Sequence, residues 1–168
     1  MKKITKKDKR LFLESHFSHE VELMVQSFLL YVHPQLFRSE VVMEAFLIHV
    51  RNFYEFFYIN EGKNNAHAVD YIPKWKVKKK LIGLKRWNTQ INNYLLHLSY
   101  ERNLQESKPY TEYKIDVLYN HFREVILDFW EELPKYYKKP YLTKLINNLK
   151  EVRWKSDKNS YPRLGRLR

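Results

Sequence analysis

Apolar side chains recur at the spacing of an α-helix along most of this chain, and this periodicity limits the fold more than any other feature. In the clearest case, one face of residues 39–59 carries Val42, Phe46, Val50, Phe53 and Phe57. No strand-like alternation extends beyond four residues, and the 168-residue chain has only three glycines for tight turns. The sequence therefore predicts an all-α fold, a single-domain bundle of about five helices.

Serine, threonine and proline residues mark the ends of the predicted helices. Ser18, Ser39 and Thr111 can each act as an N-cap, and Pro140 suits the first turn of a helix. The predicted helices cover residues 18–32, 39–59, 84–100, 111–133 and 141–152, with a short additional helix near 8–16. We expect residues 1–155 to form the helical bundle domain. Residues 156–168 are expected to form a basic, flexible C-terminal tail, because they contain few apolar side chains.

The chain is strongly basic, with 31 Lys and Arg residues against 19 Asp and Glu residues and a net charge of +12. An AT-rich genome also enriches lysine, so the distribution of the cations is more informative than their total. Residues 74–86 hold seven cations and no acid, which predicts a nucleic-acid-binding surface made by Lys74, Lys76, Lys78, Lys79, Lys80, Lys85 and Arg86. RNA or another nucleic acid is the expected partner. The alternatives are an acidic protein, such as an antitoxin, and a membrane surface bound by an amphipathic helix at 74–86.

Several functional classes lack the residues that they need. The chain has no cysteine, which excludes disulfides and thiolate metal sites, and its isolated glycines form no phosphate-binding loop. His16, His19 and Glu20 share one helical turn, but no second group of ligands accompanies them, so we predict no metal or cofactor. The N-terminal segment lacks the apolar core of an export signal, and no uncharged stretch could span a bilayer. We therefore expect a cytoplasmic protein.

Some aromatic residues lie beside basic residues rather than at core spacing: Tyr71, Trp75, Tyr136, Tyr137 and Trp154. Such rings can stack on unpaired bases, as they do in proteins that bind single-stranded RNA. They can equally pack over the core from the connections between helices. The sequence leaves both interpretations open.

Polar groups gather on one face of the predicted 84–100 helix, where Arg86, Asn93 and His97 align. In the 39–59 helix, Arg51 and Glu55 have the spacing of an i,i+4 ion pair. His49 falls at the edge of the apolar face, where we expect a neighbouring side chain to satisfy its ring. This polar stripe is either a binding site or a solvated helix face.

The stretch INNYLLHLSYERN, residues 91–103, resembles the HEPN superfamily of small all-helical domains. The RNase members of that superfamily carry an arginine, often followed by asparagine, and a histidine after four to six intervening residues. Asn92 to His97 has this spacing, and Asn93 matches the asparagine, but Asn92 stands where the arginine belongs. The resemblance implies a dimeric, metal-independent RNase in which His97 moves protons and an arginine stabilises the charge on the attacked phosphate. Arg51 or Arg102 would have to supply that guanidinium.

Residues 44–103 also resemble an uncharacterised bacterial helical family with H-x-R-N and H-L-[ST]-Y-x-R motifs, which match residues 49–52 and 97–102. The two resemblances together predict a HEPN-like, RNA-engaging protein, acting as a toxin or phage-defence RNase. Its predicted catalytic residues are His97, Arg102, Arg51, His49 and Asn93. The alternative is a non-catalytic helical adaptor or nucleic-acid-binding module.

Overall fold

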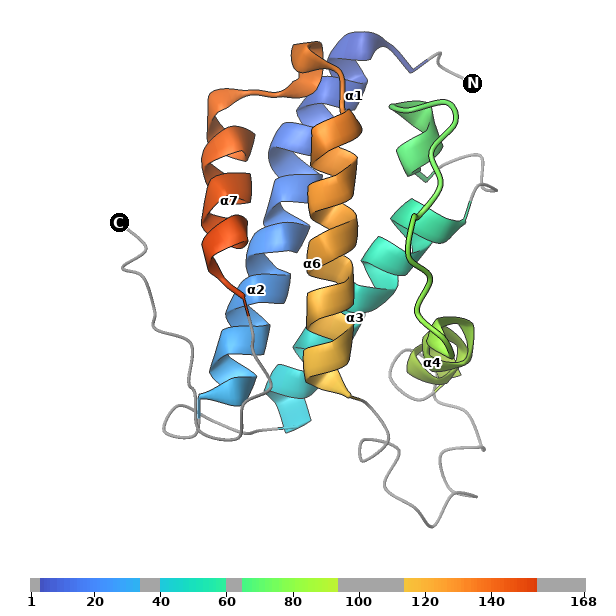
Figure 1. Ribbon diagram of the computed structural model, residues 1–168, viewed down its shortest axis with the longest axis vertical. Coiled ribbons are helices and arrows are strands. Elements are labelled where there is room, and N and C mark those ends of the chain that lie inside the picture. Colours follow the sequence, from blue (N-terminus) through green and yellow to red (C-terminus); the bar gives the residue numbers. More distant parts are fainter. Residues whose placement is uncertain (1–3, 34–39, 60–64, 94–113, 154–168) are drawn as a thin grey trace.

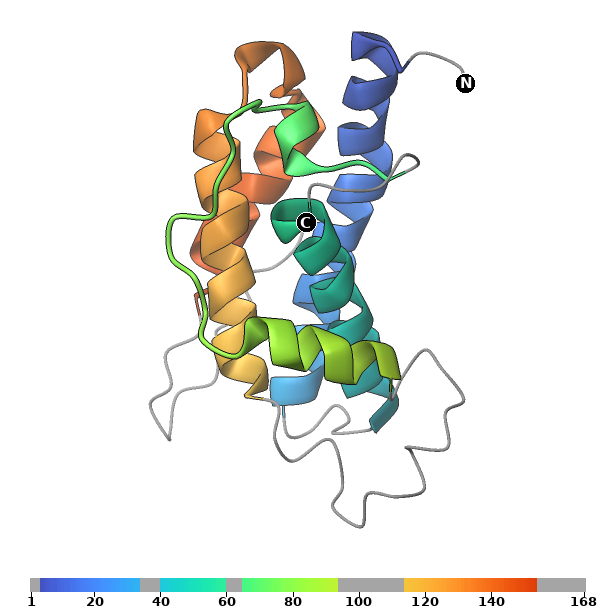
Figure 2. The same cartoon turned by 90° about the vertical axis from the view of Figure 1, so that its right-hand side faces the viewer.

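A computed structural model describes residues 4–33, 40–59, 65–93 and 114–153, and the described residues form helices and no strand. The helices are α1 (Lys6–Phe12), α2 (Ser18–Val32), α3 (Glu40–Tyr58), α4 (Leu84–Ile91), α6 (Ile115–Glu132) and α7 (Pro140–Glu151). The long helices run beside one another, and α4 crosses them near one end of the bundle (Figures 1 and 2). The predicted all-α bundle is confirmed. The predicted C-terminal tail and the predicted caps Ser39 and Thr111 lie outside the described residues.

The first two helices form one continuous rod, because a turn of π-helix (Leu13–Phe17) joins α1 to α2. The rod begins at Thr5, whose hydroxyl accepts from the backbone N–H of Asp8, while the Asp8 carboxylate accepts from the Thr5 N–H. This reciprocal pair is a capping box. The prediction of Ser18 as an N-cap was wrong. The Ser18 hydroxyl instead donates to the Glu14 carbonyl at 2.6 Å, one turn back inside the rod.

Helix α3 is the central helix and contacts α2, α4 and α6. The buried face is wider than predicted, because Leu47 and Phe56 are buried beside Phe53 and Phe57, whereas Val42 is half-buried. Phenylalanine rings dominate the centre: Phe17 and Phe57 each lie within about 6 Å of Phe129, in tilted and edge-to-face arrangements. The aromatic residues at helical spacing therefore form the core, as their spacing predicts.

Helices α6 and α7 form an antiparallel pair, in which both helices contact α2, and Pro140 occupies the first turn of α7 as predicted. A buried arginine on α6, Arg123, binds the last turn of α7. The guanidinium of Arg123 donates to the carbonyl oxygens of Leu149 at 3.0 Å and Lys150 at 2.6 Å. These carbonyls belong to the last turn of α7, which lacks intrahelical donors. The cation also lies at the negative end of that helix.

The segment between α3 and α4 is irregular but anchored. A short 3-10 turn (Ala68–Asp70) precedes Tyr71 and Trp75, which are both buried in the core, and Trp75 packs edge-to-face on Phe129 at 5.4 Å. Gly83 then adopts a φ of +83° and begins α4. A glycine tolerates this left-handed conformation, whereas a residue with a Cβ does not adopt it readily.

A part-buried hydrogen bond between Tyr58 and His121 joins α3 to α6. The Tyr58 hydroxyl lies 2.6 Å from Nε2 of His121. Burial lowers the pKa of His121 from its ordinary value of 6.5, as does the charge of Lys79, while Glu124 acts in the opposite direction. Neutral His121 therefore accepts a hydrogen bond from the Tyr58 hydroxyl, and protonation of the ring would remove this acceptor.

Stability is therefore expected to decrease as the pH falls below 6.5, because the unfolded chain then binds a proton that folded His121 resists. Urea unfolding of the wild type and of His121→Gln between neutral pH and mildly acidic pH measures this contribution. The free energy of unfolding should fall less steeply with acidification in His121→Gln, which cannot titrate. Equal slopes for the two proteins would show that His121 does not cause the pH dependence.

Candidate functional site

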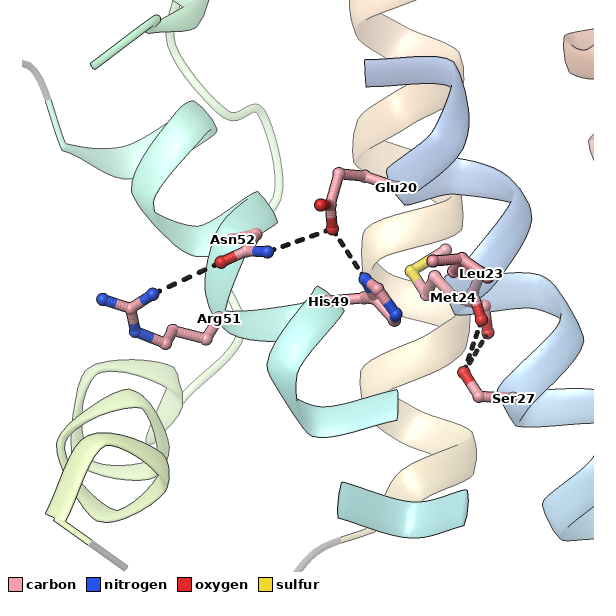
Figure 3. Close-up of polar contacts among 7 residues, drawn as sticks. All are labelled: Glu20, Leu23, Met24, Ser27, His49, Arg51 and Asn52. Atoms are coloured by element: carbon pink, nitrogen blue, oxygen red, sulfur yellow. Dashed lines mark hydrogen bonds and ion pairs between the residues drawn. The ribbon is translucent and has the colours of Figure 1, made fainter. Parts of the chain in front are cut away.

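A carboxylate on α2 holds two side chains of α3 (Figure 3). Oε2 of Glu20 accepts from Nδ1 of His49 at 2.6 Å and from Nδ2 of Asn52 at 3.1 Å. The three side chains lie on the facing sides of two helices that pack along each other, and each is partly buried. The predicted satisfaction of His49 by a neighbour is confirmed, and Glu20 is that neighbour.

Glu20 is held in its charged form. Burial raises the pKa of this carboxyl, but the hydrogen bonds from His49 and Asn52, with the charges of His49 and His19, outweigh burial. The pKa is therefore lowered from its ordinary value of 4.5. A carboxylate that is ionised at neutral pH and accepts two hydrogen bonds fixes the orientation of both partners.

The polar chain continues from Asn52 to Arg51, which reaches three neighbours. Nη1 of Arg51 donates to Oδ1 of Asn52 at 3.3 Å, and Nη2 forms an ion pair with Oε1 of Glu55 at 2.7 Å. The predicted i,i+4 pair of Arg51 and Glu55 is thus confirmed. The third contact crosses to the end of α4, where Nε donates to Oδ1 of Asn92 at 2.5 Å.

We call the connected side chains the polar chain; its members are Glu20, His49, Asn52, Arg51, Glu55 and Asn92. It links α2, α3 and the end of α4. About a quarter of the Arg51 side chain, 26%, remains exposed to solvent, so this side chain can be reached from outside the bundle. The contacts above use three of the five guanidinium N–H groups, which leaves two for an anionic ligand.

The structure brings together only part of the predicted catalytic set. His49 and Arg51 belong to the same polar chain, and Asn93 lies half-buried in the π-helical turn that follows α4, next to Asn92. His97 and Arg102 lie outside the described residues. Of the two arginines considered as partners of His97, Arg51 is therefore the one that the structure describes.

Sequence reasoning missed Glu20 as a member of this site, and it named Asn92 only as a departure from a motif. Glu20 precedes Val21, a fully buried residue of α2, so it stands at the edge of the apolar face. That position is the one local signal that could have drawn attention to it. Its contact with α3 depends on how two helices pair, which spacing within one helix does not reveal.

In the predicted nucleic-acid-binding surface, residues 74–83 run along α6 as an irregular segment, and residues 84–86 form the first turn of α4 (Figure 2). All of its predicted cations are exposed, but two of them have carboxylate partners on α6. Nζ of Lys78 lies 3.0 Å from Glu132 and 3.5 Å from Asp128, and Nζ of Lys79 lies 3.8 Å from Glu124. Part of this charge therefore fastens the segment to the bundle.

Two of the alternatives for this region do not fit the structure. Trp75 and Tyr71 are almost fully buried and cannot stack on bases; Tyr137 is buried as well. The membrane-surface helix fails because residues 74–83 are not helical, and Trp75 and Leu84 point into the core. Trp154 lies outside the described residues. Of the five aromatic residues beside basic ones, Tyr136 alone is described as exposed.

Within the described ranges, none of the helices combines the length and apolar character needed to cross a bilayer. The same ranges contain no cluster of three or more histidine or acidic side chains suited to a metal ion. Comparison of the chain with models of protein families, with curated protein sequences and with solved structures found no match. The polar chain must therefore be interpreted from its own chemistry.

Proposed function

We propose that this protein is a HEPN-like, metal-independent endoribonuclease, acting as a toxin or phage-defence component. The observation that carries the proposal is the hydrogen bond from Nε of Arg51 to Asn92. Asn92 occupies the position at which the resembled motif has its arginine, five residues before His97 in the sequence. The guanidinium that the motif lacks at residue 92 is thus supplied, by a contact across 41 positions, from α3.

The reaction needs no group beyond RNA and the side chains of the protein. The 2′-oxygen of the ribose attacks the adjacent phosphorus, and the bond from phosphorus to the 5′-oxygen of the next nucleotide breaks. His97 takes the proton from the 2′-hydroxyl and delivers it to the leaving 5′-oxygen. Arg51 stabilises the extra negative charge on the phosphate oxygens in the transition state. The products carry a 2′,3′-cyclic phosphate and a 5′-hydroxyl.

His49 has a positioning role in this proposal. Its Nδ1 is engaged by Glu20, and Glu20 also holds Asn52, whose amide oxygen accepts from Arg51. A guanidinium fixed in this way loses little rotational freedom when it meets a phosphate, which is how preorganised charge lowers a barrier. The exposed cations of residues 74–86 would contribute long-range attraction for the RNA backbone.

The test is cleavage of end-labelled RNA by the full-length protein in the presence of a chelator, with His97→Ala as the comparison. We expect cleavage that persists in the chelator, products that end in a cyclic phosphate, and loss of both cleavage and growth arrest in His97→Ala. Cleavage that requires a divalent cation, or that is unchanged in His97→Ala, would contradict the proposal.

A second candidate, a non-catalytic adaptor, is favoured by the ion pair of Arg51 with Glu55. In an adaptor, Glu55 neutralises Arg51 within α3, and the bond from Arg51 to Asn92 fastens α4 against α3 without any contact to a phosphate. An adaptor would bind RNA in a salt-dependent manner without cutting it. The same labelled RNA distinguishes the two, because intact RNA that is bound by the protein supports the adaptor.

A further inference from the structure

An exposed tyrosine with two cations over its ring lies at the end of the bundle where α1 begins. Tyr136 lies in a 3-10 turn (Lys135–Tyr137) between α6 and α7, and 47% of it is exposed. Cζ of Arg10, from α1, and Nζ of Lys139 each lie 5.8 Å from the centre of its ring. Residues that are far apart in the sequence therefore meet at this end (Figure 1).

The turn that carries Tyr136 is firmly held. Its neighbour Tyr137 is buried and packs edge-to-face on Tyr71 at 5.4 Å. Nζ of Lys138 donates to the carbonyl of Glu131 at 3.1 Å, which closes the end of α6. A ring on such a support has little freedom to lose on binding, so a stacking partner would meet a preorganised surface.

Cations outnumber acids on the two elements that carry Arg10 and Tyr136. Lys6 and Lys7 of α1 and Lys135 of the 3-10 turn are exposed. The nearby carboxylate of Asp8 is engaged by the backbone N–H and the hydroxyl of Thr5. Nε of Arg10 is buried and has no hydrogen-bond partner among the described residues. Because this atom is shielded from solvent, a phosphate would meet the terminal N–H groups of Arg10, which form strong contacts with phosphate oxygens.

We propose that this end of the bundle binds a single-stranded stretch of RNA, with one unpaired base stacked on Tyr136 and adjacent phosphates on Arg10 and Lys139. The inference rests on the proposed function in taking RNA as the partner, and it adds a second contact surface to the basic segment of residues 74–86. An exposed aromatic ring bordered by cations is the combination that binds single strands without sequence preference. An acidic peptide would use the cations but has no base to place on the ring.

The test is fluorescence anisotropy with a single-stranded oligoadenylate of about 12 nucleotides, a length within the usual range of such sites. The 2′-hydroxyls are methylated, which removes the nucleophile, so binding is measured without cleavage. Loss of one base–aromatic stack costs about 1–3 kcal/mol, so Tyr136→Ala should weaken binding about 5- to 150-fold. Tyr136→Phe, which keeps the ring, should bind within about twofold of the wild type.

A duplex of the same length is the matched probe, because its bases are already stacked and cannot reach the ring. Tyr136→Ala should bind this duplex as the wild type does. Equal losses on both probes, unchanged binding of the single strand, or failure of the wild type to bind it would overturn the inference. Displacement of the oligonucleotide by poly-glutamate from the wild type and Tyr136→Ala with equal ease would also overturn it.

These outcomes separate this inference from the proposed function. If binding of the methylated strand depends on Tyr136 and ordinary RNA is not cleaved, the proposed nuclease activity is contradicted and the proposed binding surface is supported. Cleavage that depends on His97, with binding insensitive to Tyr136, would do the reverse.

Discussion

Cleavage of RNA by the Arg51→Ala protein is expected to be about 10²- to 10³-fold slower than by the wild type, the usual loss when one preorganised donor to a developing negative charge is removed. Arg51 is the described arginine that reaches the segment of the HEPN-like motif, through Asn92. The effect should appear mainly in kcat, because the charge on the phosphate grows in the transition state. Single-turnover kinetics with labelled RNA would measure it.

Two further variants distinguish catalysis from support of the fold. Glu55→Gln removes the ion-pair partner of Arg51 but keeps the guanidinium, so it should retain far more activity than Arg51→Ala. The double variant Arg51→Ala, Asn92→Arg places an arginine at the motif position and should recover part of the lost rate. Equal losses in Arg51→Ala and Glu55→Gln, with no recovery in the double variant, would assign Arg51 to the adaptor instead.

Unfolding of the Arg123→Met protein is expected to require about 2–4 kcal/mol less free energy than that of the wild type. The substitution keeps most of the apolar stem but leaves the carbonyls of Leu149 and Lys150 without their donor. A buried acceptor that loses its partner costs about 1–3 kcal/mol; the bond to Leu149 is buried, and the bond to Lys150 is part-buried. Burial also lowers the pKa of Arg123 from its ordinary value, but not enough to remove its charge at neutral pH. Urea denaturation measures the difference.

Lys150→Met is the matched control for this prediction. It removes a cation from the same turn of α7, but the Lys150 side chain is exposed and forms only a surface ion pair with Glu131 at 3.3 Å. Its stability should change by less than about 1 kcal/mol. If the Arg123→Met and Lys150→Met proteins are equally stable, the hydrogen bonds from Arg123 to the two carbonyls add nothing to the free energy of unfolding beyond the effect of its charge.

The helices could be predicted because their signals are local. The spacing of apolar residues, Pro140 and the i,i+4 relation of Arg51 to Glu55 each depend on a few adjacent turns, and the structure confirms all three. The wrong cap at Ser18 had a local cause too. Serine suits a helix start in general, but here the hydrogen-bond ladder continues through a π-helical turn that no residue type announces.

The contacts that build the polar chain could not be predicted, because they join segments that are distant in the sequence. Glu20 reaches His49 across 29 positions, and Arg51 reaches Asn92 across 41. The burial of Trp75 could not be predicted either, and the sequence left both interpretations of this ring open. Its segment has no periodicity, so nothing local indicated that this ring enters the core while the lysines around it stay outside.

The continuous rod from Lys6 to Val32 carries Arg10 near its start and Glu20 near its middle. Ten residues of helix span about 15 Å, and a hydrogen-bonded rod has no hinge between them. The rod therefore fixes the distance between the tyrosine-bearing end of the bundle and the polar chain. An RNA strand anchored by one base at that end would meet Arg51 at a fixed number of nucleotides from the anchor. The lengths of the cleaved RNA fragments would then reflect the distance from that end of the bundle to Arg51.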